Sequence, residues 1–344
     1  MSQIDHLSDL GNNEAVLYLR VAEIEQCWTA KGDPYLSLQL ADVTRNLAAK
    51  IWHDRPYYEE TAELQAGQVV KVLARLGSYQ GKPQLEIQKL RATNDWDRED
   101  YSAEKVFGPG YGHVKDMVAQ TLVMDIETAP SPRASDLPEK LEQDIQRTAK
   151  DRDWDKDKVI GLNPLFSQAI SVAVGDAGRE GGRVLFAPKE EELAKWAQDA
   201  PDWLVPLTEK ELLGAFWTLA GLAGTVVTFN GRNFDLPFLR VRSAIHEVPV
   251  FVDLLSQPPY KHRPHLDLFQ ILTNNGRGMA PMNLDAACFA FGIESPKEAM
   301  DGSQVGPAYQ EGRYLDIARY NLADVEATRR LYWKLKNNVV DFLV

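Results

Sequence analysis

Two carboxylates near the middle of the sequence have the spacing of a divalent-metal site. Asp125 and Glu127 are two residues apart in the apolar run Val-Met-Asp-Ile-Glu-Thr, so on a β-strand their side chains point to the same face. Such carboxylates repel each other unless a cation joins them, and their oxygens are hard ligands that suit Mg²⁺ or Mn²⁺. The pair alone fits a strand end with solvated acids equally well.

Two further acids and a tyrosine follow in other expected elements. Asp235 comes after an apolar strand and a glycine-containing turn, where a helix is expected to begin. Taken alone, it fits capping or compensation of the helix dipole better than catalysis. Tyr320 and Asp324 are four residues apart on the expected terminal helix, which places the phenol and the carboxylate on one face. These residues are informative because of their order along the chain, which is Asp-x-Glu, then Asp, then Tyr-x-x-x-Asp.

Alternating strands and helices are expected to position these residues. The periodicity predicts strands at 122–126, 168–174, 183–186 and 225–229, and helices near 137–150, 190–198, 209–220, 234–246 and 313–337. This alternation predicts a layered α/β domain over residues 121–344. The uncharged run 212–229 only just reaches membrane-spanning length, and its glycines favour a buried helix followed by a strand.

The first part of the chain is predicted to be an all-β domain over residues 14–92. Five strand-like runs separated by turn signals lie within 16–91, and only 56–63 can form a short helix. Residues 1–13 are expected to be a flexible N-terminus. Residues 93–120, which are acidic and then glycine-rich without periodicity, are expected to be a linker.

The composition is that of a globular protein and argues against three classes of protein. The net charge of −12 argues against a protein that coats duplex DNA through bulk positive charge, and the acidic excess lies outside the nearly neutral region 16–91. Cys27 and Cys288 are far apart, which excludes a disulfide framework and a zinc ribbon. With a polar N-terminus that lacks the order of a signal peptide, these features predict a cytoplasmic protein without a membrane partner.

The ordered acids resemble the DEDD, or DnaQ-like, superfamily of 3′-5′ exonucleases, which has a ribonuclease H-like fold. The tyrosine subgroup fits because Tyr320 precedes Asp324 by four residues, while the histidine subgroup would place His at position 319, which is Arg. The likeness is strongest to the exonuclease domain of family B DNA polymerases, because Phe-Asn-Gly-Arg-Asn-Phe-Asp-Leu-Pro-Phe-Leu, residues 229–239, fits their second motif throughout.

This resemblance implies a two-metal phosphodiester hydrolase that releases nucleoside 5′-monophosphates from a 3′ end. It implies that two divalent cations, Mg²⁺ or Mn²⁺, are held by four carboxylates, those of Asp125, Glu127, Asp235 and Asp324. Tyr320, with an ordinary pKa near 10, is expected to orient the attacking water and not to act as a strong base.

Residues beside the second motif are candidate contacts to the terminal nucleotide. Asn230 and Asn233 are expected to contact it, although Asn233 could equally cap the following helix. Phe234 is a candidate stacking residue, with core packing as the alternative. His246, His262 and His265 are expected to be surface or loop histidines, and the sequence assigns no role to Asp267.

Residues 16–91 resemble an OB-fold of the nucleic-acid-binding type that precedes some bacterial 3′-5′ exoribonucleases. Because side chains alternate along a strand, Leu36, Leu38 and Leu40 are expected to point inward. Tyr35 is then expected on the outer face with Lys50 and Trp52. Aromatic side chains and a lysine on this face suit stacking of single-stranded bases. The alternatives are a protein-binding OB-fold and a tryptophan covered by the second domain.

These features together predict a metal-dependent 3′-5′ exonuclease that acts on single-stranded DNA, with the OB-fold domain holding the single strand. The first alternative is an exoribonuclease that acts on RNA. The second is a non-catalytic single-strand-binding or scaffold protein, which gives no physical reason to keep four buried carboxylates.

Overall fold

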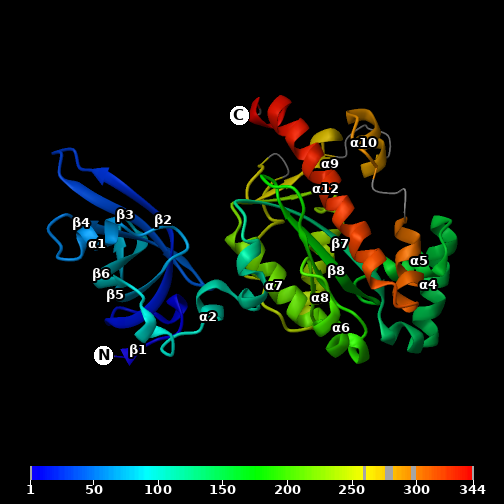
Figure 1. The fold of residues 1–344 in the computed structure, drawn as a ribbon, viewed down its shortest axis with the longest axis horizontal. Coiled ribbons are helices and arrows are strands. Elements are labelled where there is room, and N and C mark those ends of the chain that lie inside the picture. The colour runs from blue at the N-terminus through cyan, green and yellow to red at the C-terminus, as the bar shows by residue number, and fades with distance from the viewer. Residues whose placement is uncertain (1, 259–260, 276–281, 296–299, 343–344) are drawn as a thin grey trace. The chain divides into compact units, whose positions relative to one another are not determined.

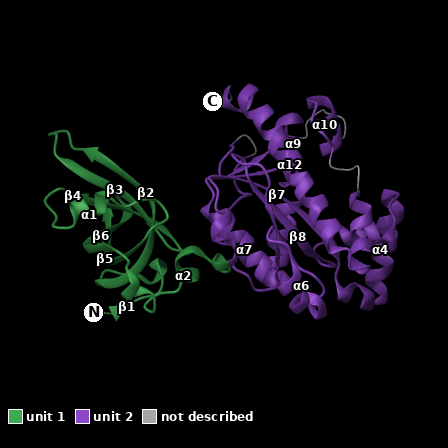
Figure 2. Cartoon of the chain, viewed as in Figure 1, with its two compact units in different colours: residues 1–112 green, residues 113–344 purple. Residues whose placement is uncertain are grey.

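The computed structural model describes residues 2–258, 261–275, 282–295 and 300–342, which form two compact units (Figures 1 and 2). The first unit ends at Gly112 and the second begins at His113. No helix within the described residues is long and apolar enough to cross a membrane.

The first unit is a closed β-barrel with the strand order of an OB-fold. Its sheet runs β1-β2-β3-β4-β6-β5, and pairing of β2 with β5 closes it. Helix α1 (Tyr58–Ala62) lies between β4 and β5 in the sequence, as expected for this fold. The strands are β1 (Ser2–Gln3), β2 (Ala15–Trp28), β3 (Pro34–Ala41), β4 (Asn46–Trp52), β5 (Val69–Tyr79) and β6 (Lys82–Ala92).

Alternation along β3 and β4 builds the barrel core. Leu36 pairs with Ile51 and Leu38 with Ala49 in an antiparallel register, and all four side chains are buried. The intervening residues of β3 and β4 point outward because successive side chains on a strand alternate between its faces. The predicted barrel is therefore confirmed with the expected inner face.

The N-terminal residues are packed on the barrel, which differs from the flexible segment expected over 1–13. Leu7 and Leu10 are buried in the barrel core. The amide of Leu7 donates to the carboxylate of Asp42 at 2.6 Å, and β1 pairs with β2 in parallel. Burial of two leucines and a fixed hydrogen bond outweigh the polar composition of this segment.

Residues 93–120, expected to be a linker, contain short helices and are divided between the two units. Residues 93–112 pack on the barrel, whereas Val114 and Ala119 are buried in the core of the second unit. The carboxylate of Asp97 is buried and accepts hydrogen bonds from the guanidinium of Arg91 at 2.6 and 2.8 Å. The Tyr18 hydroxyl and the Lys71 ammonium donate to the same carboxylate. The helices are α2 (Ala103–Phe107) and α3 (Tyr111–Val114), and the unit boundary falls after Gly112.

The second unit is an α/β domain built on one mixed sheet. Its order is β10-β9-β8-β7-β11-β12, in which β7, β8 and β9 are antiparallel and β11 and β12 run parallel to β7. This confirms the predicted ribonuclease H-like α/β class. The strands are β7 (Thr121–Pro130), β8 (Ser167–Asp176), β9 (Arg183–Phe186), β10 (Leu204–Pro206), β11 (Thr225–Thr228) and β12 (His265–Asp267).

Two hydrophobic clusters lie on the two faces of this sheet, one with α7 and α8 and the other with α12. The uncharged run 212–229 forms α7 and then β11, as predicted, and its helix is buried. Helices α5, α9, α10 and α11 and strands β10 and β12 were not expected. The helices are α4 (Glu139–Arg152), α5 (Lys156–Gly161), α6 (Leu193–Asp199), α7 (Glu209–Leu222), α8 (Asp235–Ile245), α9 (Leu268–Leu272), α10 (Leu284–Phe291), α11 (Val305–Gln310) and α12 (Tyr314–Asn338).

Candidate active site

Strand β7 presents its two acids to helix α12. Leu122, Met124 and Ile126 belong to the cluster that contains α7 and α8, whereas Val123 packs in the cluster that contains α12. By alternation, Asp125 and Glu127 point to the α12 face, as the period of two predicts.

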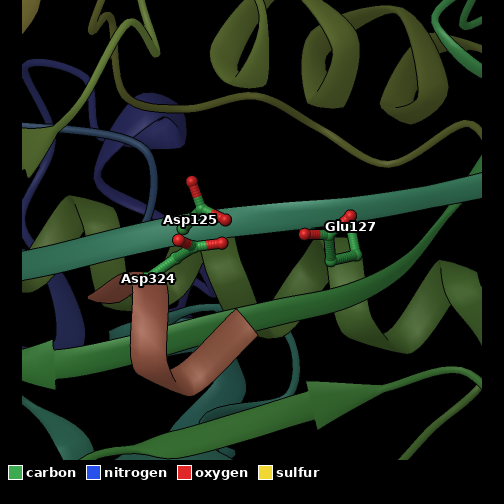
Figure 3. Close-up of side chains that lie close together, drawn as sticks. All are labelled: Asp125, Glu127 and Asp324. Atoms are coloured by element: carbon green, nitrogen blue, oxygen red, sulfur yellow. The ribbon is translucent and has the colours of Figure 1, made fainter. Parts of the chain in front are cut away.

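Helix α12 brings a third carboxylate to this pair. One carboxylate oxygen from each of Asp125, Glu127 and Asp324 lies within 4.8 Å of the others (Figure 3). The helix is fixed against the sheet by Ile317, Leu331 and Leu335, which are buried. The predicted apolar stripe thus places Asp324 over the middle of β7.

Tyr320 lies one turn before Asp324 and is almost wholly buried, with 8% of its surface exposed. Burial, followed by the charge of Asp324, raises the pKa of its phenol far above the ordinary value, and the hydroxyl lies within hydrogen-bonding reach of that carboxylate. The phenol therefore stays protonated at neutral pH and can donate a hydrogen bond at this site.

The fourth acid is joined to the others through the backbone of β7. Strand β11 pairs with β7 only as far as Val123, so the amide of Ile126 lies beyond the last paired residue. This amide donates to the carboxylate of Asp235 at 3.2 Å. Asp235 begins α8 and is buried, and the hydrogen bond places its carboxylate beside the strand segment that carries Asp125 and Glu127.

The electrostatics of the four acids fit a site for cations. Burial, followed by the charge of neighbouring acids, raises the pKa of Asp125 and of Glu127 well above their ordinary values. Burial raises the pKa of Asp235 to about 7. Ionised carboxylates are therefore disfavoured here unless a cation compensates them, and a set made only of carboxylate oxygens suits Mg²⁺ or Mn²⁺.

Asp267, to which the sequence assigned no role, fixes the turn before Asp235. One of its carboxylate oxygens accepts from the amide of Asn230 at 2.8 Å, and the other accepts from the amide of Arg232 at 2.9 Å. The amide of Phe269 donates to the same carboxylate at 3.0 Å. Burial raises the pKa of Asp267, while these amides oppose the increase. Asp267 thus acts on the site through the loop that carries the second motif.

The candidate nucleotide contacts lie on this loop. The side-chain amide of Asn233 is exposed and donates to the side-chain oxygen of Asn230 at 2.8 Å. The alternative that Asn233 caps the next helix is wrong, because Phe234 occupies the N-cap position of α8 and provides no side-chain cap. The ring of Phe234 is partly buried against Phe238, 5.6 Å away between centroids. The roles of Asn230, Asn233 and Phe234 toward a nucleotide remain predictions.

His265 is buried, so its expected place among surface or loop histidines is wrong. It lies on β12, and its Nε2 is 2.8 Å from the hydroxyl of Thr228 on the adjacent β11. Burial lowers the pKa of His265 to about 4, so the ring is neutral at neutral pH. Pairing of β12 at the edge of the sheet explains the burial, and the sequence showed no sign of this three-residue strand.

The barrel carries a second candidate surface, made of Tyr35, Lys50, Trp52 and Tyr79 and called here the barrel aromatic surface. Tyr35 pairs with Trp52 across β3 and β4, with ring centroids 5.2 Å apart. The ammonium of Lys50 lies 5.0 Å from the ring centre of Tyr35 and 5.2 Å from that of Tyr79. Tyr79 was not among the residues expected on this surface, although it directly precedes the Gln-Gly turn between β5 and β6.

A family model matches the C-terminal part of this chain. Residues 197–340 match the family described as "Predicted 3'-5' exonuclease related to the exonuclease domain of PolB". The second unit is therefore an α/β domain that matches a PolB-like 3′-5′ exonuclease domain over a stretch that includes Asp235, Tyr320 and Asp324. A barrel of the OB type precedes it. This class is the one that the sequence predicted.

Individual relatives match parts of the chain. The 3'-5' exoribonuclease YhaM of Geobacillus sp. (strain WCH70) is 32% identical over 81 residues, 24% of this chain and 24% of that protein. A DNA polymerase of Thermococcus gorgonarius is 27% identical over 182 residues, 48% of this chain and 22% of the polymerase. The chain thus spans about a quarter or less of the length of these relatives.

One solved structure is similar to a part of this chain. The second OB-fold domain of replication protein A from Methanococcus maripaludis is 15% identical, with a TM-score of 0.22, and the match covers 28% of this chain and 97% of that domain.

Proposed function

We propose that this chain is a metal-dependent 3′-5′ exonuclease that hydrolyses single-stranded DNA from its 3′ end to nucleoside 5′-monophosphates. The proposal rests on one observation, the approach of the carboxylates of Asp125, Glu127 and Asp324 to within 4.8 Å on the sheet face. The family match and the exonuclease and polymerase relatives support it.

The residues that would hold the cations are Asp125, Glu127, Asp235 and Asp324. Two Mg²⁺ or Mn²⁺ ions bound there would stabilise the charge that develops on the scissile phosphate and make water a better nucleophile. Tyr320 keeps its proton because burial raises its pKa, so its hydroxyl orients the attacking water. The side chains of Asn230 and Asn233 would contact the terminal nucleotide, and Phe234 would stack on its base.

The barrel would hold the single strand through the barrel aromatic surface. Bases would stack on Tyr35 and Trp52, and Lys50 would contact the phosphates, because strands two and three of OB-folds form the ligand-binding face. This mode of binding also suits a chain with a net charge of −12, since it depends on local contacts and not on a general positive field.

RNA is the second candidate substrate. The relatives named YhaM are described as exoribonucleases, and 32% identity over 81 residues supports a likeness to part of them. The arrangement of the acids suits cleavage of either DNA or RNA, because the cations would act on the phosphate and not on the sugar.

One degradation assay separates these candidates. The purified chain is incubated with 5′-labelled single-stranded DNA, duplex DNA and RNA of the same sequence, with Mg²⁺ or Mn²⁺. We expect stepwise shortening of single-stranded DNA, loss of activity in Asp125→Ala, and full activity in the control Asp202→Ala, which removes an exposed acid of the same unit. Activity that survives in Asp125→Ala would show that the proposed site is wrong, and faster shortening of RNA would favour the exoribonuclease.

A further inference from the structure

A hollow on the second unit lies outside the site described above. It has a volume of about 460 Å³ and is bordered by the C-terminal part of α12 and by the residues that follow α10. We name it the α12 groove, and helix α12 lines it with Arg329, Arg330, Trp333, Lys334, Asn337 and Asn338.

Two of its three basic side chains leave positive charge at the surface. The guanidinium of Arg329 is mostly buried and makes two hydrogen bonds of 2.7 Å to Glu326, which compensates its charge. Arg330 is 47% exposed and reaches Glu326 only through its Nε. Lys334 is exposed and has no ion pair with any of the described residues. The groove is thus locally cationic on a chain that is acidic overall.

The aromatic side of the groove is held in place before any ligand binds. The indole nitrogen of Trp333 donates to the backbone oxygen of Ala177 at 2.6 Å, while 37% of the residue remains exposed. A ring fixed in this way loses little conformational entropy when another ring stacks on it. The exposed side chain of Asn337 adds an amide donor at the same hollow, while the amide of Asn338 donates to the backbone oxygen of Lys334 at 2.8 Å.

We propose that the α12 groove binds a stretch of single-stranded nucleic acid, with phosphates at Arg330 and Lys334 and a base against Trp333. A fixed aromatic ring beside cationic side chains is the combination that binds single strands without sequence preference. The inference rests on the proposed function, since Asp324 of the catalytic set lies on the same helix. Ten residues separate Asp324 from Lys334, which is about 15 Å along the helix axis and about 80° around it. Trp333 lies on the opposite side of the helix from Asp324, so a strand bound at both places would have to pass around α12.

A purely structural role for Arg330 and Lys334 leads to a different prediction. Basic side chains in the last turns of a helix compensate the negative end of its dipole. If Arg330 and Lys334 served only this purpose, removing them would lower the melting temperature and leave the affinity for nucleic acid unchanged.

The test measures the affinity of the whole chain for a long single-stranded DNA in the presence of EDTA, over a series of salt concentrations. The variant is Arg330→Gln with Lys334→Gln, and Glu326 keeps both of its bonds to Arg329. The control is Lys195→Gln with Lys210→Gln, which removes two exposed charges from α6 and α7. We expect an affinity loss of about tenfold or more and a decrease of about 1.4 in the slope of log K against log salt, the value for two lost phosphate contacts on a single strand.

The outcomes distinguish this inference from the proposed function. An unchanged affinity and salt slope in the groove variant would show that the α12 groove does not bind the single strand. An equal loss of affinity in the control variant would show the same. Neither result would affect the proposed exonuclease activity. If the wild-type chain degrades no nucleic acid but the groove variant still loses affinity for the single strand, the proposed exonuclease activity is wrong and the proposed binding at the α12 groove stands. If circular dichroism shows that the double variant is unfolded, Lys334→Gln alone is measured, with an expected slope decrease of about 0.7.

Discussion

The backbone amide of Ile126 donates to the carboxylate of Asp235 at 3.2 Å, although the two residues are 109 positions apart in the sequence. Ile126 lies between Asp125 and Glu127, so this one bond fixes the helix that carries the second motif to the strand that carries the first. Functional side chains keep their geometry when packing and hydrogen bonds to neighbouring groups lock them, and when they are carried by strands and helices and not by loops. We therefore expect the acids to keep their arrangement when no cation is bound.

Removing one acid is expected to stabilise the metal-free protein and to weaken its response to metal. In Asp125→Asn the melting temperature without metal should rise, because the raised pKa of Asp125 reports that its ionised form is disfavoured. Mg²⁺ or Mn²⁺ should stabilise the wild type by about 2.7 kcal/mol at a hundredfold excess over its Kd, and the variant by less. Differential scanning calorimetry with and without metal checks this, with Asp202→Asn as the control. A variant that melts below the wild type without metal would contradict it.

Replacing the phenol is expected to slow the reaction without loss of metal binding. Tyr320→Phe removes a hydroxyl beside the carboxylate of Asp324, and loss of a hydrogen bond to a charged group costs about 1.5–3 kcal/mol. This corresponds to a decrease in kcat of roughly 10- to 100-fold. The metal-induced shift in melting temperature should stay as in the wild type. Tyr332→Phe, on the same helix, is the matched control, and full activity of Tyr320→Phe would remove Tyr320 from the mechanism.

Two pairs of residues in the candidate site could be predicted from the sequence because each pair follows from local periodicity. Two residues along a strand share a face, and four along a helix do so as well, so Asp125 with Glu127 and Tyr320 with Asp324 could be paired without the fold. The place of Asp267 could not be predicted, because strand β12 has three residues and exists only through pairing with β11. The docking of Asp97 was missed for the same reason, since its partner Lys71 lies on a distant strand.

Loss of the Asp267 carboxylate is expected to change catalysis more than substrate binding. In Asp267→Asn one side-chain oxygen becomes an amide group that cannot accept from a backbone amide, so the turn at 230–232 loses one of its two anchors. We expect kcat to fall about tenfold, equivalent to about 1.4 kcal/mol, with a smaller change in KM.

The matched control is Asp253→Asn. Asp253 also accepts two backbone amides, those of Leu255 and Ser256, but lies on a different loop. Equal effects of the two variants on kcat would mean that any loop anchor matters as much as Asp267. A fall in melting temperature with kcat unchanged would make Asp267 purely structural.

The Asp97 network is expected to make the stability of the barrel unit depend on acid pH. Hydrogen bonds from Arg91 are the main cause that holds the pKa of Asp97 well below its ordinary value. A carboxyl with a lowered folded-state pKa contributes stability above its unfolded pKa of about 3.9, and this contribution is lost as the pH falls through the folded value. Asp97→Asn should therefore destabilise the unit at neutral pH by about 2 kcal/mol and flatten the acid dependence below about pH 4.

Hydrogen exchange of the barrel strands in the whole chain measures this effect. Asp95→Asn is the control, because the carboxylate of Asp95 pairs with Arg98 at the surface and is 85% exposed. An acid dependence that is the same in Asp97→Asn and in the wild type would show that other groups control it.

The barrel aromatic surface is expected to contribute affinity and not turnover. Stacking of a base on an aromatic side chain contributes about 1–3 kcal/mol, so Tyr35→Ala with Trp52→Ala should weaken binding of a long single strand at least tenfold. Adding Tyr79→Ala should weaken it further, because Lys50 has already lost the Tyr35 ring and then loses its remaining aromatic partner. Turnover of a dinucleotide, whose single phosphodiester needs only the acids of the second unit, should stay at the wild-type rate. The control Trp96→Ala removes a tryptophan of the same unit that is 91% exposed. If Trp96→Ala weakens binding as much as the double variant does, then β3 and β4 do not form the binding face and exposed aromatic area alone explains the affinity.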